Sequence, residues 1–319
     1  MGGIVELEGL SFHRPFHFIV FYPETPEKGK GARHDPNNLI DGRLKSNVMG
    51  TDTIIRLSAF LCVFAILSTA EFFTPRRRLT TSRSRRWFAN LTIVALNPLS
   101  VALVYPVLPI EVALLASEQG WGLLNQWALP YGLEVLMGVA ALDFAVYAQH
   151  VLHHAIPMLW RLHLIHHADL DFDLTTGLRF HPIEIIVSMA VKLSIVVALG
   201  APPLAVLIFE VALNATSMFN HSNIRIPGKV DWVLRLIVVT PDMHRVHHSV
   251  IIRETNSNYG FNLPWWDRLL GTYKAQPAKG HTDMVIGLSQ FRDPKRLTLP
   301  RLLILPFVGD PGRVPINRH

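Results

Sequence analysis

Five long apolar stretches constrain the fold of this 319-residue chain more than any other feature of its sequence. A helix needs about 20 apolar residues to cross the hydrocarbon core of a bilayer. Half of all residues are hydrophobic and only 17% are charged, which disfavours a soluble domain. The sequence therefore predicts an all-α membrane helical bundle with about four to five spans, at residues 53–73, 87–116, 130–148, 183–199 and 204–219.

The last two stretches are joined by Ala201-Pro202-Pro203, which predicts a helical hairpin because proline ends helices. Lys192 and Glu210 each lie nine residues from Ala201, so they should be level with each other in the middle of the membrane. An unpaired lysine there costs about 2.5 to 3.5 kcal/mol. We expect the two side chains to pair or to share a polar cavity. The alternative is a hairpin that enters the membrane incompletely, with both side chains reaching to its surface.

Six arginines fall within residues 76–86, between the first and second stretches. The net charge of +6, from 30 basic and 24 acidic residues, could indicate nucleic-acid binding. A cluster between two spans is better explained by membrane topology, because arginine-rich loops stay in the cytoplasm. The first span then runs inward, the second outward and the third inward again, and the hairpin begins and ends on the inner side.

The two ends of the chain differ from its middle. Residues 1–50 contain four prolines and mixed charges without a helical period, which predicts a poorly ordered arm. The sequence leaves open whether translation starts at the first residue or at Met49. Residues 51–273 form the predicted membrane domain, and residues 274–319 form a polar tail. We expect no ligand role for the two histidines of this tail, His281 and His319.

Eleven of the sixteen histidines lie between His150 and His248, in three clusters and two single positions. Residues three and four apart share a face of a helix, so His150 and His154 can bind one ion together. Each of the other two clusters, at residues 163–167 and 244–248, can present three nitrogens. Thr240-Pro241 is a favourable cap and first position for a helix that carries the third cluster. The clusters are His150, His153 and His154; His163, His166 and His167; and His244, His247 and His248; the single residues are His181 and His221.

Ten of these histidines are candidate metal ligands. His153 points away from the helical stripe formed by Tyr147, His150 and His154, so it is the weakest member of its cluster. Asp143 continues that stripe, and we expect it to hydrogen-bond a ligand imidazole. Ten nitrogens exceed what one ion can bind, but they suit two ions that take about five each. The topology predicted above brings all three clusters to the cytoplasmic face of the membrane. The candidates are His150, His154, His163, His166, His167, His181, His221, His244, His247 and His248.

The type of ligand limits the metal and the reaction. The only cysteine, Cys62, lies in an apolar stretch, which excludes thiolate metal sites, and imidazole suits iron, zinc and copper. Two alternatives to a redox enzyme remain. A zinc-dependent membrane hydrolase is disfavoured because His-Glu-x-x-His is absent and Glu184 lies outside the three clusters. A non-enzymatic metal-binding membrane protein would need neither O2 nor an apolar cavity.

With these clusters in place, residues 143–273 resemble the fatty acid hydroxylase superfamily, also called the sterol desaturase family. Several strings in the same order carry the resemblance, which makes it far more specific than a lone His-x-x-His-His. The strings are DFAVY (143–147) before His150 and His154, PMLWRLH (157–163) with His166 and His167, TGLRFHP (176–182), NHSN (220–223), TPDMH (240–244) with His247 and His248, and WDRLLGTY (266–273).

The resemblance implies a di-iron oxygenase in a membrane helical bundle with a cytoplasmic histidine cap. Such enzymes use O2 and two electrons to hydroxylate or desaturate sterols, fatty acyl chains or related lipids. The ten histidines would bind two iron ions, with zinc as an ion that overexpression can misload. No catalytic residue beyond the metal ligands is assigned.

No flavin, nicotinamide or haem motif is visible in the sequence, so we expect electrons from a separate ferredoxin- or cytochrome-type protein with its reductase. Arg161, Arg179 and Arg245 could dock such an acidic partner; alternatively, they hold lipid phosphates or cap helices. The expected substrate is a membrane lipid, and no nucleic-acid partner is expected.

Overall fold

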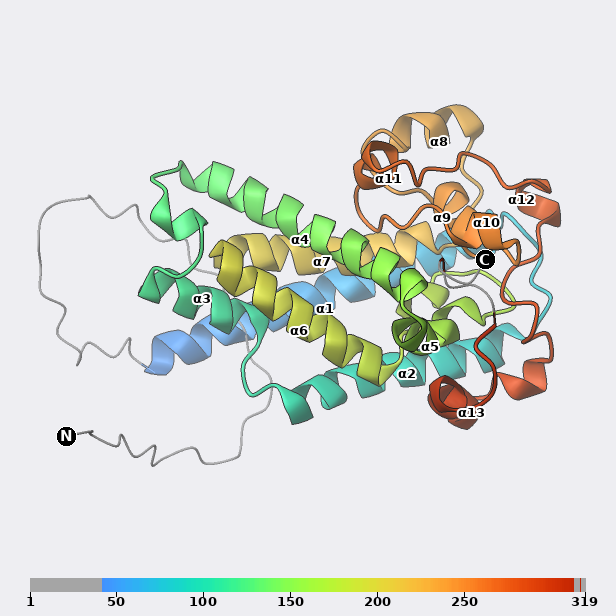
Figure 1. The fold of residues 1–319 in the computed structure, drawn as a ribbon, viewed down its shortest axis with the longest axis horizontal. Coiled ribbons are helices and arrows are strands. Elements are labelled where there is room, and N and C mark those ends of the chain that lie inside the picture. Colours follow the sequence, from blue (N-terminus) through green and yellow to red (C-terminus); the bar gives the residue numbers. More distant parts are fainter. Residues whose placement is uncertain (1–41, 313–315, 317–319) are drawn as a thin grey trace, which may run out of the picture. The chain divides into compact units, whose positions relative to one another are not determined.

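The computed structural model describes residues 42–312 and Ile316, and the regular structure in this part of the chain is helical (Figure 1). The chain divides after Ala59 into two compact units. The first unit contributes the first part of α1 (Gly42–Phe73), and the elements described below belong to the second unit. Most of the predicted arm, residues 1–41, lies outside the described residues, as does His319, whereas α1 already includes residues 42–50.

Five segments of the described chain are long and apolar enough to cross a membrane, which confirms the predicted membrane helical bundle. Side chains on their surfaces, such as Leu103 and Leu136, remain 88% and 65% exposed. Lipid accommodates such surfaces, whereas water disfavours large apolar patches. The segments are Thr51–Phe73, Arg83–Gln126, Tyr131–Ala155, Pro182–Leu199 and Pro203–Asn220.

The second span is interrupted in a segment that contains prolines. α2 (Arg83–Val104) contains Pro98, and α3 (Pro109–Gln119) begins with a proline at its first position. Proline is favourable there because the first N–H groups of a helix have no partner within the helix. A single turn, η1 (Leu124–Gln126), follows and leads to the next span.

The predicted hairpin consists of α6 (Pro182–Leu199) and α7 (Pro203–Asn220). Gly200 at its turn has a φ of 69°, a conformation that favours glycine, and a Cβ there would lie 2.5 Å from the carbonyl oxygen of Trp121. Lys192 Nζ donates a hydrogen bond to Glu210 Oε1 at 2.6 Å. The predicted pairing of these two charges within the spans is therefore confirmed.

α4 (Tyr131–Ala155) packs against both helices of the hairpin and runs beside them in Figure 1. The short elements at the histidine-bearing end of α4 form what we call the cap, residues 156–181 and 221–312. α9 begins as the sequence predicts, because the Thr240 side chain accepts a hydrogen bond from the N–H of Met243. The cap contains α5 (Pro157–His167), η2 (Thr176–Leu178), α8 (Gly228–Leu234), α9 (Pro241–His247), α10 (Ile252–Thr255), α11 (Trp265–Leu269), α12 (Gly280–Asp283), η3 (Pro294–Arg296), α13 (Leu299–Ile304) and η4 (Leu305–Phe307).

Arginines of the segment between α1 and α2 and of the first turn of α2 are bound to the cap. Arg86 is buried and donates to Asp169 Oδ1 at 2.7 Å and to Asp173 Oδ2 at 2.6 Å. Arg76 forms an ion pair with Asp242 at 3.0 Å. Breaking a buried ion pair by removing one partner typically costs about 3 to 5 kcal/mol. These arginines therefore hold the cap in place, a role that the sequence alone did not indicate.

The tail after residue 273 packs against the helices that carry histidines. Leu302 and Leu305 share a buried apolar cluster with Trp160 of α5. The indole N–H of Trp160 donates to the carbonyl oxygen of Pro311 at 2.9 Å. This predicted polar tail therefore contributes apolar side chains to the support of α5.

Candidate metal centre

Nine buried histidines from distant parts of the chain lie together in two groups of ring nitrogens. Within each group, one nitrogen per ring can be chosen so that all lie within 4.8 Å of one another. The residues come from the end of α4, from α5, from the C-terminal end of α7, and from α9 with the residue that follows it. Group one contains His150, His154, His163, His167 and His247, and group two contains His166, His221, His244 and His248.

Helix α5 contributes to both groups, and so does α9 with its C-cap. His163 and His167, four residues apart, belong to group one, whereas His166 belongs to group two. With 3.6 residues per turn, the third and fourth residues after a given position point about 100° apart. The arrangement is reversed at α9, where His244 and His248 belong to group two and His247 to group one. The second and third clusters of the sequence are thus each divided between the two groups, whereas His150 and His154 of the first cluster both belong to group one.

The nitrogens of group one are arranged to hold a cation. His150 Nε2 and His163 Nε2 lie 3.1 Å apart. His150 Nδ1–H donates to the carbonyl oxygen of Tyr259 and His163 Nδ1–H donates to Glu184 Oε1, each at 2.7 Å. In the neutral rings both Nε2 atoms then carry a lone pair and no proton, so they repel each other unless a cation lies between them. Two nitrogens about 2.1 Å from one ion, at a right angle, would be about 3 Å apart.

The rings around His221 in group two follow the same plan. His221 Nδ1–H donates to the carbonyl oxygen of Ser217 at 2.8 Å. Its Nε2 lies 3.1 Å from His166 Nε2 and 3.2 Å from His248 Nε2. A backbone acceptor on one ring nitrogen fixes the tautomer and leaves the other nitrogen for a metal ion.

Burial keeps these imidazoles uncharged. Removal from water lowers the pKa of His163, His221 and His247 to about 3 in each case. The neutral ring is the form that binds a metal, so these side chains need not lose a proton at pH 7. A donor set of five and four neutral imidazoles fits divalent ions such as iron and zinc.

The structure places two predicted site residues elsewhere. His181 belongs to neither group, since its Nδ1 accepts the N–H of Ile183 at the start of α6 and its Nε2–H donates to the carbonyl oxygen of Leu303. Both ring nitrogens are therefore engaged with the backbone. Asp143 Oδ2 accepts a hydrogen bond from the indole of Trp266 at 2.7 Å. Asp143 thus orients Trp266. The hydrogen-bond acceptor of His150, the role expected for Asp143, is instead the carbonyl oxygen of Tyr259.

Glu184 lies outside the histidine clusters in the sequence, but the structure places it against His163 of group one. It is buried, accepts the hydrogen bond from His163, and has Oε1 3.8 Å from Nε2 of His153. His153 itself donates from Nδ1 to the carbonyl oxygen of Gln149 at 2.9 Å and is in neither group. The one available signal was the position of Glu184 three residues after His181, in the first turn of α6.

Of the three arginines considered for partner docking, Arg161 is half-buried and donates to the carbonyl oxygens of Pro306 and Gly309, whereas the other two are enclosed within the protein. Arg179 and Arg245 are 1% and 0% exposed. Arg179 Nε donates to the carbonyl oxygen of Ile165 at 2.7 Å, and Arg245 pairs with Asp242. Neither guanidinium is available to a partner protein, because each is enclosed by the residues that balance its charge.

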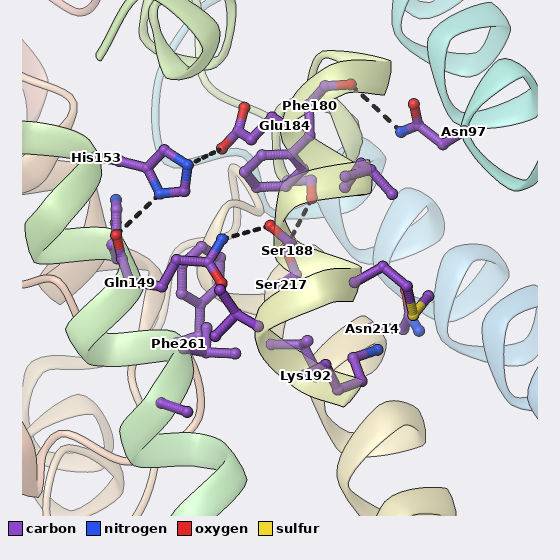
Figure 2. Close-up of a pocket in the computed structure, with 18 of the residues that line it drawn as sticks. Asn97, Gln149, His153, Phe180, Glu184, Ser188, Lys192, Asn214, Ser217 and Phe261 are labelled. Carbon is purple, nitrogen blue, oxygen red and sulfur yellow. Dashed lines mark hydrogen bonds and ion pairs between the residues drawn. The ribbon is translucent and has the colours of Figure 1, made fainter. Parts of the chain in front are cut away.

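A cavity of about 330 Å³ opens beside group one. His150 and His163 line it together with apolar side chains of α4, α6 and α7, among them Leu142, Met189 and Phe209. Figure 2 shows His153 and Glu184 toward one end of the cavity and Lys192 and Asn214 toward the other. An apolar cavity that reaches candidate metal-binding nitrogens is suited to a lipid chain.

Comparison with known proteins gives a family and several relatives. The family model described as fatty acid hydroxylase matches residues 135–272, which include the histidines of both groups. The ornithine lipid hydroxylase OlsE of Rhizobium tropici is 31% identical over 239 residues, which cover 71% of this chain and 69% of the relative.

Two further relatives match over shorter segments. The alkylglycerol monooxygenase of Xenopus tropicalis is 32% identical over 139 residues, 43% of this chain and 30% of its own length. The cholesterol 25-hydroxylase of Rattus norvegicus is 29% identical over 146 residues, 45% of this chain and 47% of its own length. This chain thus spans less than half the length of these two relatives. No solved structure matches it.

Proposed function

Because the chain belongs to the fatty acid hydroxylase family, we propose that it is a membrane oxidoreductase that inserts oxygen into a C–H bond of a lipid at a pair of iron ions. One atom of O2 enters the product and the other leaves as water, which consumes two electrons and two protons. The relatives are named as hydroxylases or monooxygenases, which favours hydroxylation over desaturation.

The main support for this proposal is that the two histidine groups lie next to each other and that the apolar cavity reaches group one. The rings of His167 and His248, one from each group, have centroids 4.6 Å apart, so two ions held by the groups would be neighbours. His150 and His163 belong to group one and also line the cavity. A lipid chain in the cavity would therefore present its carbon atoms directly beside the ion-binding nitrogens.

The proposed ligands are the nine histidines of the two groups, without His181. Bound iron would supply activation of O2. The protein contributes neutral nitrogens in fixed tautomers, held by acceptors such as Tyr259 and Glu184, and an apolar cavity that keeps water from the reacting carbon. Zinc fits the same donor atoms and is the ion we expect when overexpressed protein is misloaded.

We further propose that the metal centre faces the cytoplasm, because the arginine-rich loop at residues 76–86 lies at the same end of the chain's spans and such loops remain inside. Electrons would then come from a cytoplasmic ferredoxin- or cytochrome-type protein with its reductase. Residues 51–273 would carry the oxidase domain, with residues 274–319 as the tail that supports it.

The test is to purify the full chain from iron-supplemented cells, reconstitute it in nanodiscs with a ferredoxin, its reductase and O2, and profile the products. We expect about two iron ions per chain and a lipid product 16 mass units heavier, with 18O incorporated from labelled O2. Candidate substrates are an ornithine lipid, an alkylglycerol and a sterol. One zinc ion with a cleaved lipid would instead identify a hydrolase, and bound metal without any product would identify a metal-binding protein.

A further inference from the structure

The cavity runs along the membrane-spanning helices. Its lining residues recur at helical spacing on α4, from Leu142 to His153, and on α6, from Glu184 to Lys192. Eight residues of helix rise about 12 Å, so Lys192 lies about 12 Å along α6 from Glu184. Since Glu184 hydrogen-bonds to His163, one end of the cavity lies at the metal-binding nitrogens and Lys192 lies near the other.

The end away from the histidines contains a hydrogen-bond donor. Lys192 lines the cavity, and its side chain is 17% exposed. An ammonium has three N–H donors, of which one is directed at Glu210 Oε1. Asn214, one turn further along α7 than Glu210, also lines the cavity there (Figure 2). A polar site of this kind is costly inside a membrane span and commonly marks a functional position.

The charge of this site selects the type of ligand. Lys192 and Glu210 together carry no net charge, so an anionic group placed beside them would bring an uncompensated negative charge into the span. An uncharged acceptor can take an N–H of Lys192 without that penalty. The walls between the two ends are formed by apolar side chains such as Val146, Met189 and Leu213, which suit the hydrocarbon on either side of the acceptor.

We propose that Lys192 is a substrate-binding residue that donates a hydrogen bond to an uncharged oxygen within the lipid, a carbonyl or a hydroxyl, at the end of the cavity away from the carbon that is oxidised. The substrate class is thus a lipid with an oxygen function inside its apolar part. A free carboxylate or phosphate at that point, or an unbroken saturated chain, would bind less tightly. The position of the oxidised carbon rests on the proposed function, whereas the binding of the oxygen does not.

A carbonyl scan tests the proposal without a metal. The full chain, in nanodiscs and treated with a chelator, is given octadecane or octadecanones in which the ketone occupies successive carbons, in competition with tritiated octadecane. We expect one ketone position to bind roughly tenfold more tightly than octadecane, which has no oxygen, equivalent to about 1.4 kcal/mol. The preference should disappear in the double variant Lys192→Met, Glu210→Gln, which removes the donor without leaving an unpaired charge.

Ser194→Ala is the matched control, because Ser194 lies on the exposed face of the same helix; its scan should equal that of the wild type. A flat profile in the wild type overturns the proposal even if the double variant does not fold. An identical peak in a folded double variant overturns it as well.

Turnover with iron and reductant separates the two proposals. If both hold, moving the ketone by one carbon should move the hydroxylated carbon by one. A binding peak without any hydroxylated product would refute the proposed function and leave Lys192 as the oxygen-binding residue. Hydroxylated product together with a flat binding scan would support the proposed function and refute the role of Lys192 in binding the oxygen.

Discussion

Glu184 accepts the Nδ1–H of His163 at 2.7 Å and thereby directs the Nε2 of that ring toward His150. A carboxylate in this position makes the imidazole a better donor and fixes its orientation. We predict that Glu184→Leu weakens iron binding by about 10- to 100-fold, whereas Glu184→Gln, which keeps an acceptor oxygen, retains most of it. Iron retained against a graded series of chelator concentrations measures the difference. Equal retention by the two variants would show that this hydrogen bond does not matter for the metal.

The difference between His181 and the clustered histidines predicts a contrast in metal content. His166→Ala removes a nitrogen from group two and should lower bound iron well below two per chain. His181→Ala should leave the iron content unchanged and cost about 1 kcal/mol of stability, because it removes the side chain that caps α6. Metal analysis and a melting curve of each purified variant provide the readout. Loss of iron in His181→Ala would return that residue to the ligand set.

The buried imidazoles predict the pH dependence of the metal-free protein. Burial lowers the pKa of His163, His221 and His247 to about 3, whereas an unfolded histidine titrates near about 6.5. Between these values the unfolded chain binds protons that the folded chain does not, so stability is full above about pH 6.5 and falls as the pH drops toward about 3. Melting temperatures of chelator-treated protein should therefore decrease from pH 7.5 to pH 5.5. A constant melting temperature across this range would contradict the assignment of these rings as buried and neutral.

The arginine-rich loop offers a test of its structural role. Arg86→Met removes the guanidinium that Asp169 and Asp173 share, leaving Asp169 with only the more distant Arg179 at 3.7 Å, and should cost about 3 to 5 kcal/mol. Arg78→Met removes the same charge from an exposed position of the loop just before α2 and should change stability by less than about 0.5 kcal/mol. Thermal unfolding in detergent compares the two variants. Similar losses in both would mean that the loop acts through its total charge alone.

The sequence predicted the parts of the fold that depend on local pattern. The apolar stretches, the proline turn of the hairpin and the helix N-cap at Thr240 follow from composition and from backbone chemistry within one segment. The pairing of Lys192 with Glu210 could be predicted because a hairpin with a known turn relates the two residues by counting alone.

Other features of the site depend on how segments pack against one another. The spacing of residues along the sequence carries no information about that packing. Nothing in the sequence distinguishes His166 from His163 and His167, because the division between the two groups depends on what faces each side of α5. Glu184 became part of the site only because α6 starts beside α5. The backbone carbonyls of Tyr259 and Ser217 that fix the tautomers carry no side-chain signal at all, since every residue has a carbonyl oxygen.

The division of α5 and α9 between both groups has a mechanical consequence. Each of these helices, α9 with its C-cap residue, would bind one of the proposed ions with two rings and the other with one ring. A rotation of either helix would therefore shift both ions in concert. The separation between the ions would be set by the rigid backbone of a single helical turn, and it would stay constant while lipids enter and leave alongside.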